Sequence, residues 1–293
     1  MGVVRSMTGF GHAGAQSAEH RLAVEVRTVN HRFLDVAVRL PREYGALEDR
    51  IRRAVTQHIE RGRVDVTVRI DRLTSPVRGV HVDTHLAHAY YEALKELRRV
   101  LRLPGSIDVD MLLDLPDVLR VEQAEEDLDA LWAALAPLLD AALRQVVAMR
   151  EAEGAALAQD LAQRAARVEA QVEAVAGRAP EVVQAYRRRL EGRLAEWGDL
   201  AVDPQRVAAE VALMAERSDI SEECVRLRSH CRQFRELLAQ GGPVGRRLDF
   251  LLQEMHREIN TIGAKAADLD IAGRVVEVKA ELEKMREQVQ NVE

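Results

Sequence analysis

The sequence has few cysteines and few aromatic residues, and each shortage excludes a class of protein. Cys224 and Cys231 are the only cysteines among 293 residues, which excludes a disulfide-rich scaffold. They lie seven residues apart in one helical pattern, which is too far for a disulfide within the helix. We therefore expect two free core thiols in a reducing compartment. Aromatic residues make up 3% of the chain, so its apolar content is mostly Ala, Leu and Val, as in helix-rich soluble proteins.

The sequence also lacks a long apolar run. The stretch 131–143 is shorter than the roughly 20 residues that a membrane-spanning helix needs, and it contains Pro137 and Asp140. The first residues, MGVVRSMTGFGH, lack the hydrophobic region of a secretory leader. We therefore expect a cytoplasmic protein with no membrane partner.

The charge is acidic overall but uneven along the chain. A formal net charge of −6 argues against a protein coated uniformly with a polyanion. Residues 21–72 nevertheless contain 12 Arg against 8 Asp and Glu. If nucleic acid binds, this basic region is one place to look.

The N-terminal part reads as a sheet with a helix. Alternation of apolar and polar residues predicts strands at 21–29, 33–40 and 64–70, and amphipathic spacing predicts a helix over 42–59. Asn30, His31 and Arg32 separate the first two strands and predict a turn or bulge. We expect a mixed or antiparallel sheet with the helix packed on one face.

Beyond the sheet, helical patterns dominate. A helix is predicted over 83–102, with Asp83 or Thr84 as its N-cap. Its predicted buried stripe is Leu86, Tyr90, Leu94, Leu97 and Leu101. A short helix around 109–113 follows.

An alanine-rich helical run then leads to the C-terminal part. Pro137 is expected to mark a start, a kink or a boundary in this run, and a second helix at 181–197 is predicted to turn back across Ala179-Pro180 as a helical hairpin. Four further helices are predicted near 204–216, 219–240, 245–266 and 271–290.

These patterns together predict an α+β fold, in which an N-terminal sheet-plus-helix domain precedes a long-helical, all-α C-terminal region. We place an N-terminal α/β domain at 1–125, a helical spacer or arm at 126–203 and a C-terminal helical domain at 204–293.

The helices at 219–240 and 245–266 carry the densest polar pattern. Each has an apolar stripe with polar groups beside it. The flank of the first helix contains Asp219, Glu223, Arg226 and His230; the flanks of the second contain Glu254, Glu258 and Lys265 on one side, and Asp249, His256 and Asn260 on the other. Such positions lie at the rim of a helix–helix contact, so groups from two helices can converge where water is partly excluded.

These side chains suit phosphodiester chemistry. Glu254 and Glu258, four residues apart, could share a hard divalent cation, and Glu223 and His230 could complete or neighbour that set; carboxylate and imidazole ligands favour Mn²⁺ or Mg²⁺. His230 could alternatively serve as a general acid or base near neutral pH. Arg226, Arg257 and Lys265 could hold phosphate oxygens.

Each of these features also has a simpler interpretation. Two glutamates four residues apart are typical of a solvated or salt-bridged helix face, and His230 and His256 are typical of hydrogen-bonded structural residues. Arg246 and Arg247 could serve simply to cap the start of a helix and to keep it soluble. The link at 241–245 lacks a Gly-Lys-Ser/Thr ending, which argues against a Walker-type phosphate loop.

Motifs at both ends of the chain resemble the YicC/YloC family of bacterial endoribonucleases. They are RSMTGFGHA at 5–13, TVNHRFLDVAVRLP at 28–41 and, near the other end, RSDISEECVRLRSHCRQF, GPVGRRLDFLLQEMHREINTIGAKA and VVEVKAELEKMREQVQNVE. The resemblance implies a metal-dependent, Mn²⁺-favouring endoribonuclease directed at single-stranded RNA. It also implies a homohexamer in which N-terminal domains and C-terminal helices together enclose the RNA.

The resemblance carries over residue by residue at both ends. The matching residues are Asn30, His31, Arg32, Glu223, Arg226, His230, Gln253, Glu254, Arg257, Glu258, Asn260, Thr261 and Lys265. His256 departs from the family pattern, in which Asn is more frequent, so pH dependence or substrate preference could differ if this position touches substrate.

The leading hypothesis is therefore an endoribonuclease with Mn²⁺, or Mg²⁺, as cofactor. The expected catalytic residues are His230, Glu254, Glu258 and Lys265; the expected metal ligands are Glu223, Glu254 and Glu258; and the expected RNA-binding residues are Asn30, His31, Arg32, Arg226, Arg246, Arg247, Arg257 and Asn260. The turn with His31 and Arg32 would bind RNA or contact a neighbouring subunit. The alternatives are a non-catalytic RNA-binding adaptor that delivers RNA to a partner nuclease, and a purely structural helical oligomer.

Overall fold

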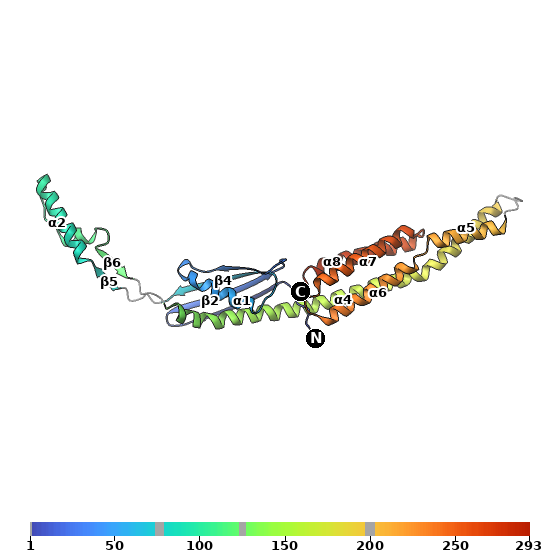
Figure 1. Ribbon diagram of the computed structural model, residues 1–293, viewed down its shortest axis with the longest axis horizontal. Coiled ribbons are helices and arrows are strands. Elements are labelled where there is room, and N and C mark those ends of the chain that lie inside the picture. Colours follow the sequence, from blue (N-terminus) through green and yellow to red (C-terminus); the bar gives the residue numbers. More distant parts are fainter. Residues whose placement is uncertain (1, 74–78, 123–126, 197–202) are drawn as a thin grey trace.

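The computed structural model describes residues 2–73, 79–122, 127–196 and 203–293. The molecule is elongated, with a sheet-containing part and a helical bundle joined by one long helix (Figure 1). A small unit of two strands and two helices lies at one end, beside the sheet. The predicted α+β fold is confirmed.

The sheet has four strands in the order β1-β2-β4-β3. β1 (Gly9–Gln16), β2 (His20–Val29) and β4 (Arg63–Arg72) are antiparallel neighbours, and β3 (Asp35–Arg39) runs parallel to β4. The sheet is therefore mixed. Its inward residues alternate along the strands as predicted, and cross-strand pairs such as Val26 and Val66 are buried.

Helices cover one face of this sheet. The predicted helix at 42–59 begins as a 3₁₀ turn, η1 (Arg42–Leu47), and continues as α1 (Glu48–Thr56). Ile51 and Val55 of α1 pack in the same core as Leu135 and Leu139 of α4 (Leu128–Glu196). Two helices therefore share the face on which the sequence predicted one.

The predicted hairpin at Ala179-Pro180 is wrong, because α4 continues unbroken for 69 residues through Pro137 and Pro180. A proline inside a helix costs about 3 kcal/mol. Val175 and Val182, on either side of Pro180, are buried in one core, and their burial in a helix-favouring, alanine-rich context offsets that cost. The chain reverses direction only between Glu196 and α5 (Pro204–Arg217); Trp197, the predicted end of the second helix, lies outside the described residues.

The segment interpreted as a spacer belongs to two cores. Leu131 to Val146 pack against the sheet, and Leu161 to Val182 pack in a four-helix bundle with α6 (Ser221–Gln240), α7 (Gly245–Lys265) and α8 (Leu269–Val289). In the bundle, α4 contacts α6, α6 contacts α7, α7 contacts α8, and α8 returns to α4. α4 is thus a shared structural element of both halves.

By length and composition alone, α4 could also cross a membrane, since one 18-residue window has a mean hydropathy of 1.3. A single such helix is weak evidence, because apolar helices of soluble cores reach the same value. The absence of a membrane partner stays a prediction.

The small unit at the end corrects the prediction for the helix at 83–102. β5 (Gly79–Val82) pairs with β6 (Leu119–Glu122), and α2 (Thr84–Leu101) and α3 (Val109–Leu113) lie between them in the chain. Asp83 is the N-cap, as predicted. The predicted stripe is not buried: no residue of α2 is, and Leu97 and Leu101 are more than half exposed. The pattern identified an apolar face correctly, but no described element covers it.

The first and last residues of the chain join the two cores. Arg5 and Glu293 exchange backbone hydrogen bonds of 3.0 and 2.8 Å, and Met7 N donates to Asn291 O. Beneath them Arg150 of α4 is 3% exposed; its Nε donates to Ser6 O at 2.6 Å and its guanidinium pairs with the Glu293 carboxylate. We call residues 5–7, Arg150 and 291–293 the terminal clasp.

Both cysteines are free and buried on α6, as predicted. Burial raises the pKa of the Cys224 thiol to about 11 and that of Cys231 to about 12. Both therefore remain protonated at neutral pH and behave as small apolar core residues.

Removing the acidic partner in the clasp should destabilise the protein. In Glu293→Ala the buried Arg150 charge loses its counter-ion, so we expect the free energy of unfolding in urea to fall by about 3 kcal/mol. Glu287→Ala, at an exposed position of α8, is the control and should change it little. Equal effects of the two substitutions would show that the ion pair adds no stability.

Two glycines of α4 should respond in opposite directions to alanine. A Cβ at Gly154 would lie 2.1 Å from Val4 O, whereas a Cβ at Gly177 would meet nothing within 4 Å. We expect Gly154→Ala to lose about 1–3 kcal/mol through overpacking, and Gly177→Ala to gain about 0.5–1 kcal/mol through helix propensity. Thermal and urea unfolding measure both; a stabilised Gly154→Ala would contradict the close approach of the N-terminal segment to α4.

Candidate functional site

The polar flanks of α6 and α7, which the sequence indicated could converge, meet within one chain because the two helices pack antiparallel. At one end Lys265 Nζ donates to Glu223 Oε1 and to the backbone oxygen of Asp219, each at 2.8 Å. Glu223 is only 8% exposed, while Lys265 lies at the rim. The pair joins the end of α7 to the start of α6.

One turn farther along, Arg226 connects the same two helices. Its Nη2 donates to Glu222 Oε2 at 2.7 Å, and its Nη1 lies 3.7 Å from Glu258 Oε1. Glu258 is 6% exposed, whereas Arg226 is largely exposed. A buried carboxylate of α7 is therefore within reach of an accessible cation of α6.

His230 and Glu254 occupy the next turns of the two helices. The contacts of Lys265 and Arg226 set an antiparallel register in which these turns face each other. His230 Nδ1 is buried without a hydrogen-bond partner, and no ion pair or hydrogen bond is recorded for Glu254 within the described ranges. A buried polar atom without a partner is costly, so a water or ligand atom would be favourable at His230.

The charges of the Glu223–Lys265 pair are stabilised by each other. Burial raises the pKa of the Glu223 carboxyl, but the hydrogen bond and charge of Lys265, a backbone hydrogen bond and the charge of Arg226 together place that pKa below its ordinary value of 4.5. The hydrogen bond to Glu223 in turn raises the pKa of Lys265 above 10.5. Both groups are charged at neutral pH.

The predicted metal ligands fit a divalent cation only in part. Glu223 Oε2 is buried without a partner, and the Glu258 carboxylate has one long ion pair, so both retain open oxygen positions. No group of three or more His, Cys, Asp or Glu that could hold a metal forms in the part of the chain that the structure describes. Glu223, Glu254 and Glu258 would therefore need oxygen atoms of water or substrate to complete a coordination sphere, as Mg²⁺ sites commonly do.

The N-terminal candidates form a second cluster. Asn30 Nδ2 donates to Gln290 O at 2.7 Å, and His31 Nδ1 lies 2.9 Å from Phe33 O in the predicted turn. The Arg32 guanidinium lies over the Phe33 ring at 5.2 Å. The turn therefore packs against the end of α8, not against the Glu223–Lys265 pair.

Arg246 joins this second cluster. A cavity of about 280 Å³ is lined by Met7, Asn30, Arg61, Gly245, Arg246, Asp249, Val289, Gln290 and Val292. Arg246 and Lys265 lie at opposite ends of α7, roughly 28 Å apart along its axis at 1.5 Å per residue. The structure thus brings the predicted residues together as two clusters, one at each end of α7.

The remaining predicted residues lie along α7 between the clusters. Arg247, Arg257 and Asn260 are exposed. Gln253 Nε2 donates to Asp249, and Thr261 Oγ1 donates to Arg257 O. His256 faces α8, where its Nε2 lies 3.8 Å from Glu283, and burial lowers its pKa. His256 therefore stands apart from both clusters.

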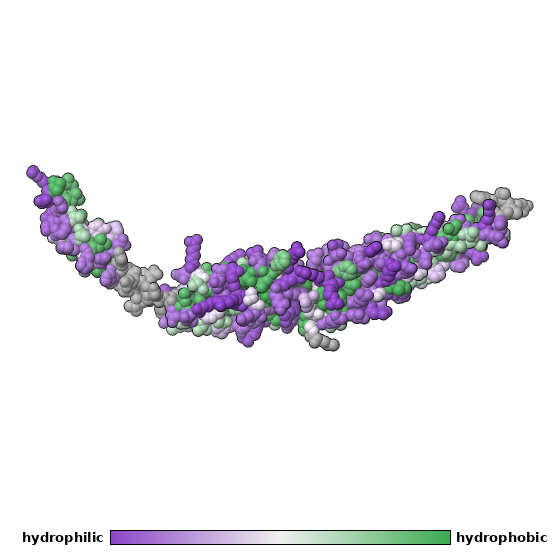
Figure 2. Space-filling view, in the orientation of Figure 1, coloured by the Kyte–Doolittle hydropathy of each residue, from purple (hydrophilic) through white to green (hydrophobic). Residues whose placement is uncertain are grey.

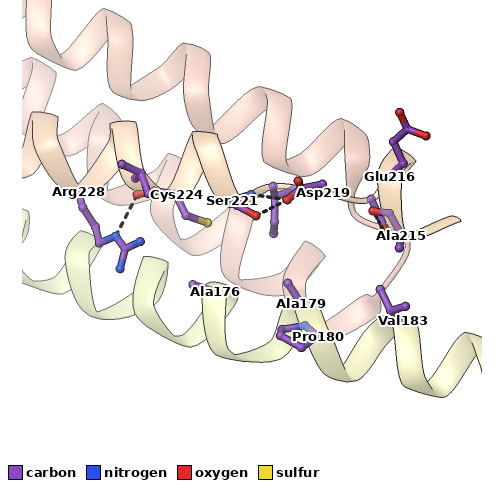
Figure 3. Close-up of a pocket in the computed structure, with 13 residues that line it drawn as sticks. Ala176, Ala179, Pro180, Val183, Ala215, Glu216, Asp219, Ser221, Cys224 and Arg228 are labelled. Atoms are coloured by element: carbon purple, nitrogen blue, oxygen red, sulfur yellow. Dashed lines mark hydrogen bonds between the residues drawn. The ribbon is translucent and has the colours of Figure 1, made fainter. Parts of the chain in front are cut away.

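A larger cavity, of about 520 Å³, lies where α4, α5 and α6 meet (Figure 3). Asp219 and Ser221 hydrogen-bond to each other there, and Arg228 donates to Cys224 O (Figure 3). Arg228 also pairs with Glu173 of α4. Because these polar groups are already paired and none of the predicted catalytic residues lines it, this cavity is not our candidate site.

Sequence reasoning missed two contributors. Arg61, two residues beyond the predicted helix at 42–59, is not among the predicted site residues, and neither is the backbone oxygen of Asp219 that accepts from Lys265. The local excess of arginine in 21–72 was the available signal for Arg61. A sequence pattern does not indicate which backbone oxygen accepts a hydrogen bond from a distant side chain.

The Glu223–Lys265 pair should make the free energy of unfolding depend on pH in the acidic range. A carboxyl whose folded-state pKa is lowered contributes stability that is present above its unfolded pKa and is lost as pH falls through the folded pKa. We expect Glu223→Gln to cost about 1 kcal/mol at pH 7, since water reaches Lys265, and to flatten the decline of unfolding free energy below pH 4.5. The neighbouring exposed Glu222→Gln is the control; identical pH profiles would refute the role of Glu223.

Comparison with known proteins identifies the family of the chain. Residues 4–159 match the family model described as "Endoribonuclease YicC-like, N-terminal region", and residues 175–293 match "Endoribonuclease YicC-like, C-terminal". A Clostridioides difficile protein named "Probable endoribonuclease YicC" is 40% identical over 290 residues, which cover 98% of this chain and 99% of the relative. A Haemophilus influenzae protein of the same name is 35% identical over 291 residues, covering 99% and 100%. These full-length matches confirm the resemblance seen in the motifs: the chain belongs to the YicC-like family of endoribonucleases.

Proposed function

We propose that this protein is a metal-dependent endoribonuclease that cleaves phosphodiester bonds of single-stranded RNA. The observation that carries the proposal is the α6–α7 rim, where buried carboxylates, accessible cations and an unpaired imidazole nitrogen converge. Phosphoryl transfer needs these three kinds of group: metal ligands, cations that stabilise negative charge, and a proton carrier. The names of the two relatives support the same reaction class.

The residues of the rim have distinct roles in this proposal. Glu258, with Glu254 or Glu223, would hold Mn²⁺ or Mg²⁺ through carboxylate oxygens, and water or substrate oxygens would supply the other ligands. A bound divalent cation supplies stabilisation of negative charge at the phosphoryl group. His230 exchanges a proton with a reacting oxygen through its open Nδ1, and Lys265 and Arg226 stabilise charge on the phosphate.

Single-stranded RNA is the proposed substrate because the exposed side chains of α7 can contact the phosphate groups of its backbone. Arg247, Arg257 and Asn260 lie exposed on α7 between the two clusters, so a strand that touches both clusters would pass them. Exposed aromatic side chains are few among the described residues: Phe10 and Phe33 on the sheet domain, Tyr91 on α2 and Phe250 on α7. Recognition of phosphates and shape therefore fits better than a base-by-base code.

We also propose that the protein assembles with itself, as a homohexamer in the cytoplasm. Large hydrophobic side chains are exposed on the unit of β5, α2, α3 and β6, and Figure 2 shows hydrophobic residues gathered at its free end. They are Val82, Tyr91, Leu97, Val100, Leu101, Leu103, Val109, Met111, Leu113 and Leu119. Monomeric proteins rarely expose such a patch. Its exposure therefore supports self-assembly, in which a second copy of the chain would cover it.

The adaptor hypothesis keeps one specific observation in its favour. Glu223 and Glu258 are already paired with Lys265 and Arg226, as the salt-bridge interpretation of these glutamates expected. A protein that binds RNA through the same cations and delivers it to a partner of RNA degradation needs no metal at this rim.

Cleavage of a fluorescent single-stranded RNA separates the two functions. We expect the purified protein to cleave it with Mn²⁺ and to stop when a chelator is added. Glu254→Gln with Glu258→Gln should lower the rate at least about 100-fold, because two oxygen ligands are lost. Glu277→Gln with Glu283→Gln, on α8, is the matched control and should cleave normally. Binding without cleavage supports the adaptor, and full activity of the Glu254/Glu258 double variant would refute the catalytic assignment.

A further inference from the structure

The cavity of about 280 Å³ beside Asn30 has two arginines and little to neutralise them. Within the described ranges, Arg61 makes one hydrogen bond, from Nε to His31 O at 3.4 Å, and neither Arg61 nor Arg246 has an ion-pair partner. Like charges that line one cavity repel each other unless an anion lies between them. The cavity therefore favours a negatively charged ligand.

The one carboxylate in the lining is already engaged. Asp249 accepts a hydrogen bond from Gln253 Nε2 at 2.8 Å and lies 3.9 Å from Arg286 Nε. Part of its charge is therefore directed to groups outside the cavity. The two guanidinium groups outnumber this one carboxylate in the lining, and their planar donors suit phosphate oxygens.

The neighbouring backbone holds these groups in place. Asn30 is fixed by its hydrogen bond to Gln290 O, and Arg61 by its bond to the turn at His31. Gly62 follows Arg61 with a φ of +107°, a conformation that side-chain-bearing residues rarely adopt. The lining is thus assembled from the β2–β3 turn, the start of β4 and the ends of α7 and α8.

The size of the cavity selects among anions. Sites for whole small molecules usually measure about 300–1,000 Å³. A cavity of about 280 Å³ suits a single phosphate group better than a complete nucleotide. A base would have to lie outside it.

An exposed ring follows the cavity lining in the sequence. Phe33 lies three residues beyond Asn30, which lines the cavity, and is 63% exposed. Arg32 contacts its ring at 5.2 Å. Stacking of a base on an aromatic ring beside arginine is a common way to bind single strands.

We propose that this junction is an anchoring subsite for RNA, in which Arg61 and Arg246 bind one backbone phosphate and Phe33 stacks on an adjacent base. The proposal rests on the proposed function, since it assumes RNA as the ligand. It concerns binding roughly 28 Å along α7 from Lys265, so binding here and cleavage at the rim can be measured separately.

The phosphate contact is tested by the salt dependence of binding. The probe is a short fluorescein-labelled single-stranded RNA, titrated with the full-length protein in chelator while anisotropy is recorded. Arg61→Ala and Arg246→Ala should each weaken binding about tenfold and lower the slope of log affinity against log salt, by about 0.7 for one lost phosphate contact. Arg61→Lys should keep the slope, and Arg206→Ala on α5 should change neither quantity.

The stacking contact is tested by removing the bases. Phe33→Ala should weaken binding of the RNA about tenfold and leave binding of an abasic oligonucleotide of equal length unchanged; Phe33→Trp should restore it. Tyr186→Ala is the control, because Tyr186 also has an arginine beside its ring, Arg189 at 5.7 Å, but on α4.

The outcomes separate this proposal from the nuclease assignment. Arginine variants with unchanged affinity and slope, or a Phe33→Ala loss that is equal for both probes, overturn the subsite even if the protein cleaves RNA. If the protein cleaves no RNA but its variants bind RNA as expected, the subsite proposal stands and the nuclease assignment is refuted. Unchanged thermal unfolding of each variant confirms that lost binding does not reflect lost folding.

Discussion

The structure depends on one continuous helix that is buried in two cores. α4 lies against the sheet through its first turns and against α6 and α8 through its later turns. A helix of 69 residues is about 100 Å long at 1.5 Å per residue, so it fixes the direction of both halves. Between its two buried stretches, Arg150 is also buried and ties the first and last residues of the chain to the helix.

This arrangement explains why the motifs at the two ends of the sequence are neighbours. The terminal clasp brings residues 5–7 beside 291–293, and β1 then follows α4 into the sheet. The turn after β2 consequently meets the end of α8 and the start of α7, where Asn30, Arg61 and Arg246 line one cavity. Glycine permits the close packing: a Cβ at Gly11 would lie 2.0 Å from Ala142 O.

The rim of α6 and α7 shows how charge can be buried and still remain available. Glu223 and Glu258 are nearly inaccessible, yet each is balanced by a cation that reaches the surface. Burial alone would favour neutral carboxyls, but the Lys265 hydrogen bond and charge lower the pKa of Glu223. The open oxygen of Glu223 and the open nitrogen of His230 are the two buried acceptor positions at this rim that protein groups leave unused.

The sequence by itself determined the local structure and the family. Alternation predicted β2, β3 and β4, helical spacing predicted α6, α7 and α8, and the polar flanks indicated that groups of α6 and α7 could converge. The pairing of Glu223 with Lys265 came from the structure. Only the tertiary structure decided that α4 passes Pro180, that the apolar face of α2 stays uncovered, that His256 faces α8, and that Arg61 joins Arg246. Periodicity shows which face of an element is apolar, but burial, proline tolerance and the meeting of distant charges depend on what packs against that face, and that is a property of the whole fold.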